Sequence, residues 1–211
     1  MWSELLVVSG EWSDMVSDLA CRLVVISGPS GAGKSTVVRE LLANCPVPLY
    51  LSISATTRLP RRGEVADSDY FFLTPDEFAA RQAAGEFVES KQYAGNWYGT
   101  LQSQVATGLA LGKWVILEID VEGTLAVIDK YPGALTIFIH SGSVEELERR
   151  LRARKTESEA ALARRLDTAR RELAQMDRYR FQVINRDVPQ AVREVCEILL
   201  RHAKESPCSM P

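Results

Sequence analysis

The sequence holds few of the residues that build disulfide frameworks and zinc sites. Its 211 residues include four cysteines and two histidines, and no two cysteines form a C-x-x-C pair. Cysteine-stapled scaffolds and tetrahedral zinc sites need closely spaced sets of these residues. The composition therefore argues against both, and it favours reduced cysteines and a cytoplasmic location.

Long apolar runs and an excess of positive charge are also missing. No stretch approaches the roughly 20 apolar residues that a membrane-spanning helix needs. Residues 1–20 carry four acidic side chains and no lysine or arginine, whereas a secretory signal begins with positive charge. The formal net charge is −3, which argues against a nucleic-acid surface. We therefore expect no membrane or nucleic-acid partner, and we treat residues 1–20 as an N-terminal extension of unknown role.

Apolar residues are plentiful enough for a folded core, since 46% of the chain is hydrophobic and 25% is charged. Their patterns predict strands at 23–26, 50–54, 114–119, 135–139 and 181–184. They predict helices at 34–44, 75–84, 143–175 and 188–203, and another that ends before Pro132. Because strands alternate with helices, the sequence predicts an α/β fold with a mostly parallel sheet.

A glycine-rich loop follows the first predicted strand. Residues 28–35 read Gly-Pro-Ser-Gly-Ala-Gly-Lys-Ser and match the pattern G-x-x-x-x-G-K-[ST]. In such a loop the backbone N–H groups surround phosphate oxygens, Lys34 reaches the β and γ phosphates, and the Ser35 hydroxyl ligates Mg²⁺. The loop residues predicted to bind ATP are Gly28, Pro29, Ser30, Gly31, Ala32, Gly33, Lys34, Ser35 and Thr36.

A phosphate-binding loop of this kind, called a P-loop, also needs a carboxylate beside the Mg²⁺ shell, usually at the end of a neighbouring strand. Glu118 and Asp120 lie at the end of the run 114–119, and strand alternation puts them on one side. Asp120 could simply mark a strand that runs out into solvent. Glu118 lies inside the apolar run, where a charge needs a partner. We therefore predict that Glu118 joins Ser35 at the metal, directly or through water.

A second set of motifs identifies the acceptor. Residues 52–64 read Ser-Ile-Ser-Ala-Thr-Thr-Arg-Leu-Pro-Arg-Arg-Gly-Glu, and Asp-Tyr-Phe-Phe follows at 69–72 and Gly-Asn-Trp-Tyr-Gly-Thr at 95–100. From about residue 21 to 204 the sequence resembles the guanylate kinase family. The resemblance implies Mg²⁺-dependent, direct in-line transfer of the γ-phosphoryl group of ATP to GMP. It also implies a three-layer P-loop NTPase fold with an inserted small mixed α+β GMP-binding domain and a helical lid.

The resemblance assigns the GMP phosphate to two arginines and two tyrosine hydroxyls. Arg58 and Arg61 carry forked guanidinium groups, which suit a phosphate dianion, and the hydroxyls are those of Tyr70 and Tyr98. Arg58 would also take part in catalysis.

For the base, the resemblance points to Glu89, with Ser54 and Thr100 nearby and Asp120 at the amino edge. A carboxylate accepts from both guanine N1–H and the 2-amino group, whereas adenine offers neither donor. A site built on such hydrogen bonds can reject the wrong ligand by about 10⁴-fold.

A basic cluster follows at 149–165. Arg150 and Arg154 share a helix face at i, i+4, and such a face is most often only solvated. By resemblance, Arg150, Arg154 and Arg165 are lid arginines that act in catalysis with Lys34 and Arg58. Asn185, at the end of the last predicted strand, resembles a family residue near the adenine of ATP.

These motifs divide the chain into predicted segments. The P-loop core covers 21–53, 103–143 and 168–204, the GMP-binding domain 54–102, the lid 144–167 and a C-terminal tail 205–211. Two positions depart from the family pattern. Residues 65–68 read Val-Ala-Asp-Ser where a turn glycine is common, so we expect a changed loop there. Lys155 stands where another glycine is common, which predicts a stiffer or more basic lid tip.

Two rival functions make different demands on these motifs. A guanylate-kinase-like scaffold module that binds peptides would have a degraded P-loop, whereas this chain retains Lys34 and Ser35. A similar kinase acting on a phosphorylated sugar would lack Glu89 and its hydroxyl neighbours, and a purine competition assay would separate it. The sequence leaves monomer and homo-oligomer equally open.

Overall fold

The structure is a computed structural model that describes residues 20–153 and 159–205. Several predictions fall on residues outside these ranges. They concern nearly all of the N-terminal extension, Arg154 and Lys155 of the lid, and residues 206–211 of the tail.

Five parallel strands form the central sheet of the described chain, in the order β2-β7-β1-β8-β9. They are β1 (Leu23–Ser27), β2 (Leu49–Ser52), β7 (Trp114–Glu118), β8 (Leu135–His140) and β9 (Phe181–Ile184). All residues of β1 and β8 are buried, as continuous apolar runs require when helices cover both faces of a sheet. The predicted α/β class with a parallel sheet is confirmed.

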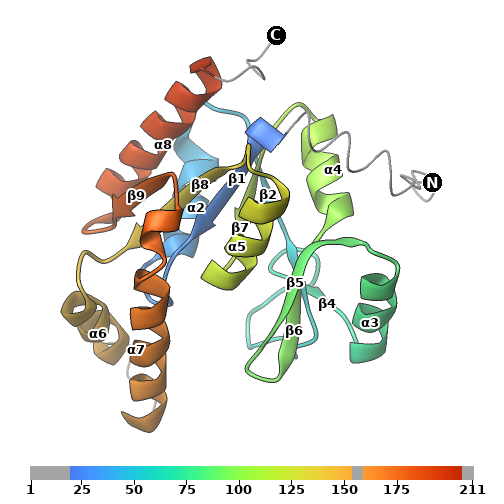
Figure 1. Cartoon of the computed structure of the whole chain (residues 1–211), viewed down its shortest axis with the longest axis horizontal. Coiled ribbons are helices and arrows are strands. Elements are labelled where there is room, and N and C mark those ends of the chain that lie inside the picture. Colours follow the sequence, from blue (N-terminus) through green and yellow to red (C-terminus); the bar gives the residue numbers. More distant parts are fainter. Residues whose placement is uncertain (1–19, 154–158, 206–211) are drawn as a thin grey trace.

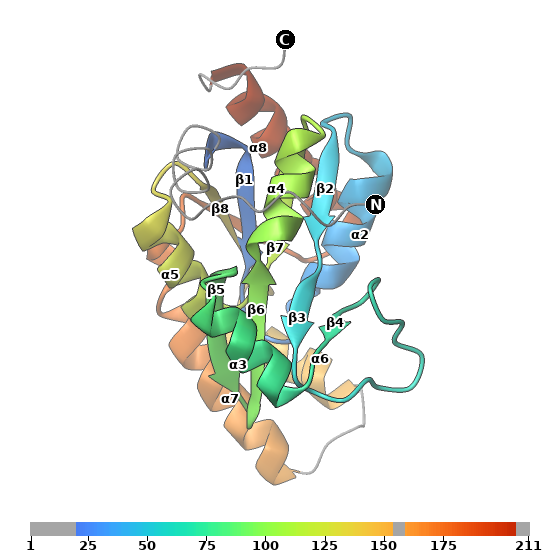
Figure 2. The same cartoon turned by 90° about the vertical axis from the view of Figure 1, so that its right-hand side faces the viewer.

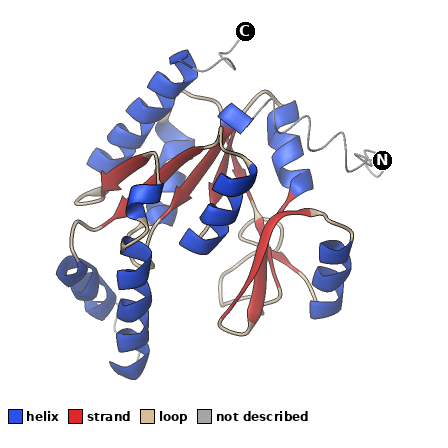
Figure 3. Ribbon diagram, in the orientation of Figure 1, coloured by secondary structure: helices blue, strands red, loops and turns tan. Residues whose placement is uncertain are grey.

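Helices cover both faces of this sheet and complete three layers (Figures 1 and 3). Val24 and Ile26 of β1 face α2 (Lys34–Asn44) and α8 (Val188–Glu205). Leu23 and Val25 alternate to the other face, toward α4 (Gln102–Ala110) and α5 (Val121–Lys130).

A second, mixed sheet has the strand order β4-β3-β6-β5. Its strands are β3 (Ser54–Thr56), β4 (Phe71–Phe72), β5 (Phe87–Tyr93) and β6 (Asn96–Leu101). Helix α3 (Pro75–Ala83) packs on it through Phe78, whose ring stacks on Phe87 at 4.4 Å. Thr74 caps this helix in a capping box with Glu77.

The prediction of one strand over 50–54 is wrong. Strand β2 ends at Ser52 in the central sheet, and β3 begins at Ser54 in the small sheet. The alternation continues through the break, so the pattern does not reveal that the chain leaves one sheet for another.

The charged segment 143–175, which the sequence predicts to be helical, forms two helices in its described parts. They are α6 (Val144–Ala153) and α7 (Glu159–Leu173), and a 3-10 turn, η2 (Met176–Arg178), follows. Leu147 and Leu151 pack against Leu162, Leu166 and Ala169. Figures 1 and 2 show this helix pair and the small sheet flanking the end of the central sheet where the P-loop lies.

In the loop at 65–68, an aspartate adopts a backbone conformation that glycine adopts most easily. Asp67 has a φ of 63°, a left-handed conformation that Asp tolerates better than most residues. Its N–H bonds to Tyr70 O at 3.0 Å, and Asp69 accepts from Val65 N at 2.7 Å.

The expectation of reduced cysteines is wrong for at least one pair. A disulfide joins Cys45, at the end of α2, to Cys196 on α8, with the Cα atoms 5.8 Å apart. The two cysteines are separated by 151 positions, so their spacing in sequence gives no sign of the pairing. Within the two described ranges no helix has the length and apolar character to cross a bilayer.

Candidate active site

The P-loop depends on glycine at positions where other residues would be strained or would clash. Gly28, Gly31 and Gly33 have φ values of 137°, 95° and 87°, which disfavour any residue with a Cβ. A Cβ on Gly28 would also overlap the backbone carbonyl of Ile139. The loop runs from buried β1 directly into α2, so the free N–H groups of the first helical turn face the loop.

Lys34 lies folded against this loop. Its Nζ donates to Gly28 O at 2.6 Å and to Pro29 O at 3.2 Å. Burial lowers the pKa of Lys34, while the nearby carboxylates of Glu118, Glu172 and Asp120 raise it. The ammonium therefore lies in the cradle, with backbone acceptors that phosphate oxygens can replace.

Ser35 and Glu118 form the oxygen pair of the predicted metal site. Strand β7 pairs with β1 so that Glu118 lies opposite Ile26, and the Ser35 hydroxyl donates to Glu118 Oε1 at 2.6 Å. A hydroxyl and a carboxylate beside a phosphate cradle suit the oxygen preference of Mg²⁺. Among the described residues there is no group of three or more His, Cys, Asp or Glu able to hold a metal alone. The pair therefore fits a metal that nucleotide phosphates share.

Three of the predicted guanine-binding residues, Ser54, Glu89 and Thr100, come together on adjacent strands of the small sheet. Thr100 of β6 lies opposite Ser54 of β3 and Glu89 of β5. The Thr100 hydroxyl donates to Glu89 Oε1 at 2.7 Å, and the exposed fractions of the two residues are 1% and 8%. Burial raises the pKa of Glu89 to about 7; Asp120 adds to this rise, while Thr100 and Lys91 oppose it.

One pocket of about 260 Å³ joins the two halves of the site. Lys34 and Glu118 line it from the P-loop side, and Ser54, Glu89 and Tyr98 line it from the small sheet. The remaining lining residues are Tyr70, Lys91, Tyr93, Gly99, Ile119 and Asp120. The phosphate cradle and the predicted base-reading groups therefore face a common space.

The arginines predicted to bind the acceptor phosphate lie differently. Arg58 forms two hydrogen bonds with Glu64, at 2.9 and 3.0 Å, and its guanidinium lies 5.4 Å from the centre of the Tyr70 ring. Tyr70 and Tyr98 lie edge to face at 6.3 Å. The Arg61 side chain is exposed, and its backbone N–H bonds to Glu64 Oε2 at 2.7 Å. The structure thus gathers Arg58 and the tyrosines, with Arg61 at the edge.

The described lid arginines contact the P-loop side of the site. Arg165 of α7 donates to the Ser30 hydroxyl. Arg150 of α6 donates to Asn185 O at 2.7 Å and to Glu146 Oε1 at 2.7 Å. These contacts tie both lid helices to the loop and to the end of β9.

Asn185 lies beneath the P-loop. It is 3% exposed, and its amide nitrogen donates to Ala32 O at 2.8 Å. A Cβ on Gly33 would lie 2.5 Å from that nitrogen. In this structure the side chain therefore holds the loop through its backbone.

Two residues of the site escaped the sequence reasoning. Lys91 lines the common pocket, and strand alternation two positions after Glu89 could have revealed it. The carboxylate of Glu172, on α7, raises the pKa of Lys34. Burial raises the pKa of Glu172 itself. No local pattern distinguishes Glu172 from its solvated neighbours.

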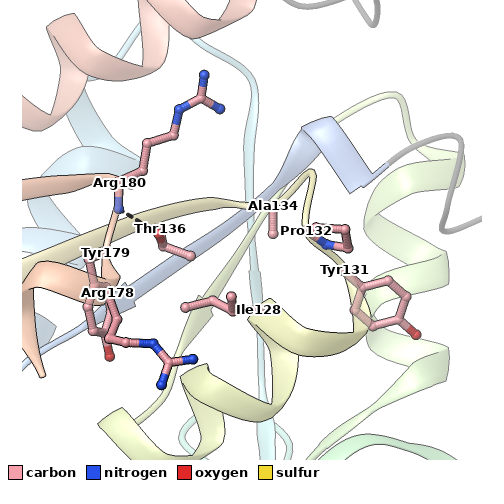
Figure 4. Close-up of a pocket in the computed structure, with 8 residues that line it drawn as sticks. All are labelled: Ile128, Tyr131, Pro132, Ala134, Thr136, Arg178, Tyr179 and Arg180. Atoms are coloured by element: carbon pink, nitrogen blue, oxygen red, sulfur yellow. Dashed lines mark hydrogen bonds between the residues drawn. The ribbon is translucent and has the colours of Figure 1, made fainter.

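A second pocket, of about 210 Å³, lies at the opposite edge of the central sheet, where β8 and β9 begin (Figure 4). The pocket is lined by Ile128, Tyr131, Pro132, Ala134, Thr136, Arg178, Tyr179 and Arg180. A guanidinium nitrogen of Arg178 lies 3.8 Å from Asp129 Oδ1, and the backbone N–H of Arg180 donates to the Thr136 hydroxyl at 2.9 Å. No predicted site residue lines this pocket.

Comparisons with known proteins agree with this geometry. The family model described as guanylate kinase matches residues 20–202. A guanylate kinase of Rhodopirellula baltica is 59% identical over 191 residues, which cover 89% of this chain and 91% of that protein. One from Gloeobacter violaceus is 46% identical, covering 88% and 90%. The crystal structure of guanylate kinase from Anaplasma phagocytophilum superposes with a TM-score of 0.71 at 28% identity, covering 89% and 88%.

Proposed function

The chain belongs to the guanylate kinase family, and on this premise we propose how its residues transfer the γ-phosphoryl group of ATP to GMP. The observation that carries the proposal is the common pocket, which Lys34 and Glu118 line from one side and Ser54 and Glu89 from the other. A donor phosphate in the cradle and an acceptor base on the small sheet would thus face the same space. The proposed acceptor domain is 54–102, and the lid is 144–167.

On the donor side, residues 28–36 would hold the triphosphate of ATP. The N–H groups at the start of α2 would bind phosphate oxygens. The Lys34 ammonium would exchange its present bonds to Gly28 O and Pro29 O for bonds to the same oxygens. Asn185 would support this cradle through its bond to Ala32 O and lie toward the adenine.

The Ser35 hydroxyl and Glu118 would hold Mg²⁺ at this cradle, Glu118 either directly or through water. The metal supplies positive charge to the phosphate oxygens when it is bound.

On the acceptor side, Glu89 would select guanine. Its ionised carboxylate accepts from guanine N1–H and the 2-amino group, while Ser54 and Thr100 supply hydroxyls and Asp120 lies at the amino edge. Adenine offers neither donor, and its N1 lone pair would face the carboxylate. A buried carboxylate left unpaired by AMP carries a penalty large enough for strong rejection.

The GMP phosphate would be held by arginines and tyrosine hydroxyls. Arg58 lies beside Tyr70 and Tyr98 with its fork fixed by Glu64, and Arg61 would join from the edge of the site. A GMP phosphate oxygen is already anionic near neutral pH, so it can attack the γ-phosphorus in line without a general base. Arg58 and Lys34 would neutralise the charge that spreads over the oxygens.

The lid arginines would complete the positive charge around the migrating group. Arg165 touches Ser30 of the P-loop, and Arg150 would turn from Asn185 O toward the phosphates when the lid closes. Arg154 is proposed for the same role, although it lies outside the described residues. ATP and GMP are thus the proposed small-molecule partners, with the cytoplasm as the proposed location.

A panel of nucleoside monophosphates tests this function. With ATP and Mg²⁺, we expect GMP to give GDP and ADP, and AMP, CMP and UMP to be far poorer acceptors in a coupled ADP-release assay. A scaffold module would turn over none of them, and a sugar-phosphate kinase would be insensitive to GMP competition. Absence of GMP turnover in folded protein that binds ATP would reject the proposal.

A further inference from the structure

Lys91 occupies a position in the common pocket that the proposed roles do not use. It lies on β5 two residues after Glu89, and strand alternation directs both side chains to the same face. Both line the pocket, and the Lys91 side chain is only 16% exposed. Its ammonium lies 5.4 Å from the centre of the Tyr93 ring. A lysine this enclosed needs partners for its charge.

The partners come from the start of α5, just after β7. Lys91 Nζ lies 2.6 Å from Asp120 Oδ2 and 2.9 Å from Glu122 Oε2. Asp120 follows β7 and caps α5, with its Oδ1 accepting from Gly123 N at 3.0 Å. Lys91 therefore links the small sheet to the start of α5 in the P-loop core, and Asp120 has a partner on each oxygen.

The charge balance at this point is sensitive to Lys91. Asp120 and Glu122 both pair with Lys91, and the buried Glu89 is affected by the charges of Asp120 and Lys91. Asp120 raises the pKa of Glu89, whereas Lys91 and the Thr100 hydrogen bond lower it against the larger effect of burial. Lys34, Glu118, Tyr70, Tyr93 and Tyr98 are the other titratable groups that line the pocket.

This balance of charges bears directly on how guanine would bind. Two donors at its amino edge, N1–H and the 2-amino group, are best met by an ionised Glu89, and a protonated carboxyl cannot accept both with the same strength. Two carboxylates can face one base edge only if a counter-charge limits their repulsion.

We propose that Lys91 is a positioning residue of the guanine site, which holds Asp120 against the small sheet and supplies the counter-charge that lets Glu89 and Asp120 face the amino edge together. This inference deepens the proposed function and rests on it. Lys91 contacts Asp120 directly and acts on Glu89 through its charge, so its effect reaches the base through these two carboxylates.

The test compares GMP with inosine monophosphate, which keeps N1–H and lacks the 2-amino group. Lys91→Met keeps most of the aliphatic stem and removes the charge, and Lys91→Arg keeps the charge. Lys130→Met, at the exposed far end of α5, is the matched control. We expect Lys91→Met to raise KM for GMP about tenfold, equivalent to about 1.4 kcal/mol. We expect its KM for inosine monophosphate to change by less than about threefold, because one of the two charge-assisted bonds is already missing.

The same variant should leave kcat and KM for ATP within about twofold, and Lys91→Arg should recover most of the GMP affinity. Equal losses for the two acceptors without recovery in Lys91→Arg would show a merely structural role and overturn the proposal, as would an unchanged KM for GMP. Calorimetric binding of the two monophosphates to the wild type and to Lys91→Met gives the same comparison without turnover. Failure of the proposed function would appear separately, as a wild type that does not phosphorylate GMP.

Discussion

The hydroxyl of Ser35 donates a 2.6 Å hydrogen bond to Oε1 of Glu118, although 83 positions separate the two residues. The contact exists because β1 and β7 are parallel neighbours with Ile26 opposite Glu118. The carboxyl ends of parallel strands meet at one edge of a sheet, so the residues after β1 and the last residue of β7 lie together. This edge is where the proposed phosphate and metal chemistry takes place.

Glu118→Gln tests the metal role of this pair. The amide keeps the size of the side chain and its bond to Ser35, but it removes the negative charge that favours a divalent cation. We expect the Mg²⁺ concentration for half-maximal activity to rise about 10–100-fold, measured by titrating Mg²⁺ at saturating ATP and GMP. Glu122→Gln serves as a control for the loss of a nearby charge. An unchanged Mg²⁺ dependence would remove Glu118 from the metal site.

Glu89→Gln tests the burial of the guanine-reading carboxyl through stability. The pKa of Glu89 rises from 4.5 in the unfolded chain to about 7 in the fold. Between these values the unfolded chain releases a proton that the folded chain keeps, so Glu89 lowers stability progressively as pH rises. The amide does not titrate, and we expect Glu89→Gln to be more stable than the wild type at pH 8 by up to about 3 kcal/mol.

Urea unfolding at pH 5 and pH 8 measures this difference, with the exposed Glu197→Gln as control. The stability gain should shrink at pH 5, where Glu89 stays protonated in the fold and the pH lies only about half a unit above its unfolded pKa. A gain that is equal at both pH values would mean that the pKa of Glu89 is not raised.

Arg58→Lys tests the acceptor phosphate site. Lysine keeps the positive charge but loses the fork that bonds Glu64 twice in the structure. We expect KM for GMP to rise at least about tenfold and kcat to fall, since hydrogen bonds to charged groups each contribute about 1.5–3 kcal/mol. KM for ATP should stay within twofold. Steady-state kinetics with Arg62→Lys, an exposed neighbour, gives the comparison, and equal effects of the two changes would argue against a specific role for Arg58.

The Cys45–Cys196 disulfide predicts a redox-dependent stability. It closes a long loop between two helices that pack together, and such a crosslink typically stabilises a fold by about 2–4 kcal/mol. Guanidinium unfolding of the wild type should therefore shift to lower denaturant when a reductant is added. Cys196→Ser lacks this crosslink. The reductant should therefore lower its free energy of unfolding less than that of the wild type, by about 2–4 kcal/mol. If both proteins respond equally to the reductant, this disulfide does not form in solution.

The parts of the fold that the sequence predicted are those set by neighbouring residues. A buried strand, a glycine loop and a helix follow one another at 23–44, and the residues of each element are sufficient to predict it. The break at Ile53 is different, because both sides favour extended backbone and only the pairing partners decide that β2 and β3 belong to different sheets. Pairing partners are tertiary information, which periodicity does not contain.

The same distinction applies to the site. Ser35 and Lys34 follow from a contiguous motif, and Glu89 and Thr100 follow from a family resemblance. The role proposed for Lys91 depends on its ion pair with Asp120, which lies on another element much later in the chain. Its importance is visible only once the two sheets face each other, and the disulfide between α2 and α8 escaped prediction for the same reason.

The central claim is that one pocket joins a phosphate cradle at Lys34 to a guanine reader at Glu89. The most direct test is the GMP-over-AMP ratio of kcat/KM for the wild type, Lys34→Ala and Glu89→Ala in one ADP-release assay. We predict a strong preference for GMP in the wild type, loss of turnover by at least about 10²-fold in Lys34→Ala, and residual turnover with a sharply reduced GMP preference in Glu89→Ala. Full GMP preference in folded Glu89→Ala, or undiminished turnover in Lys34→Ala, would contradict the account.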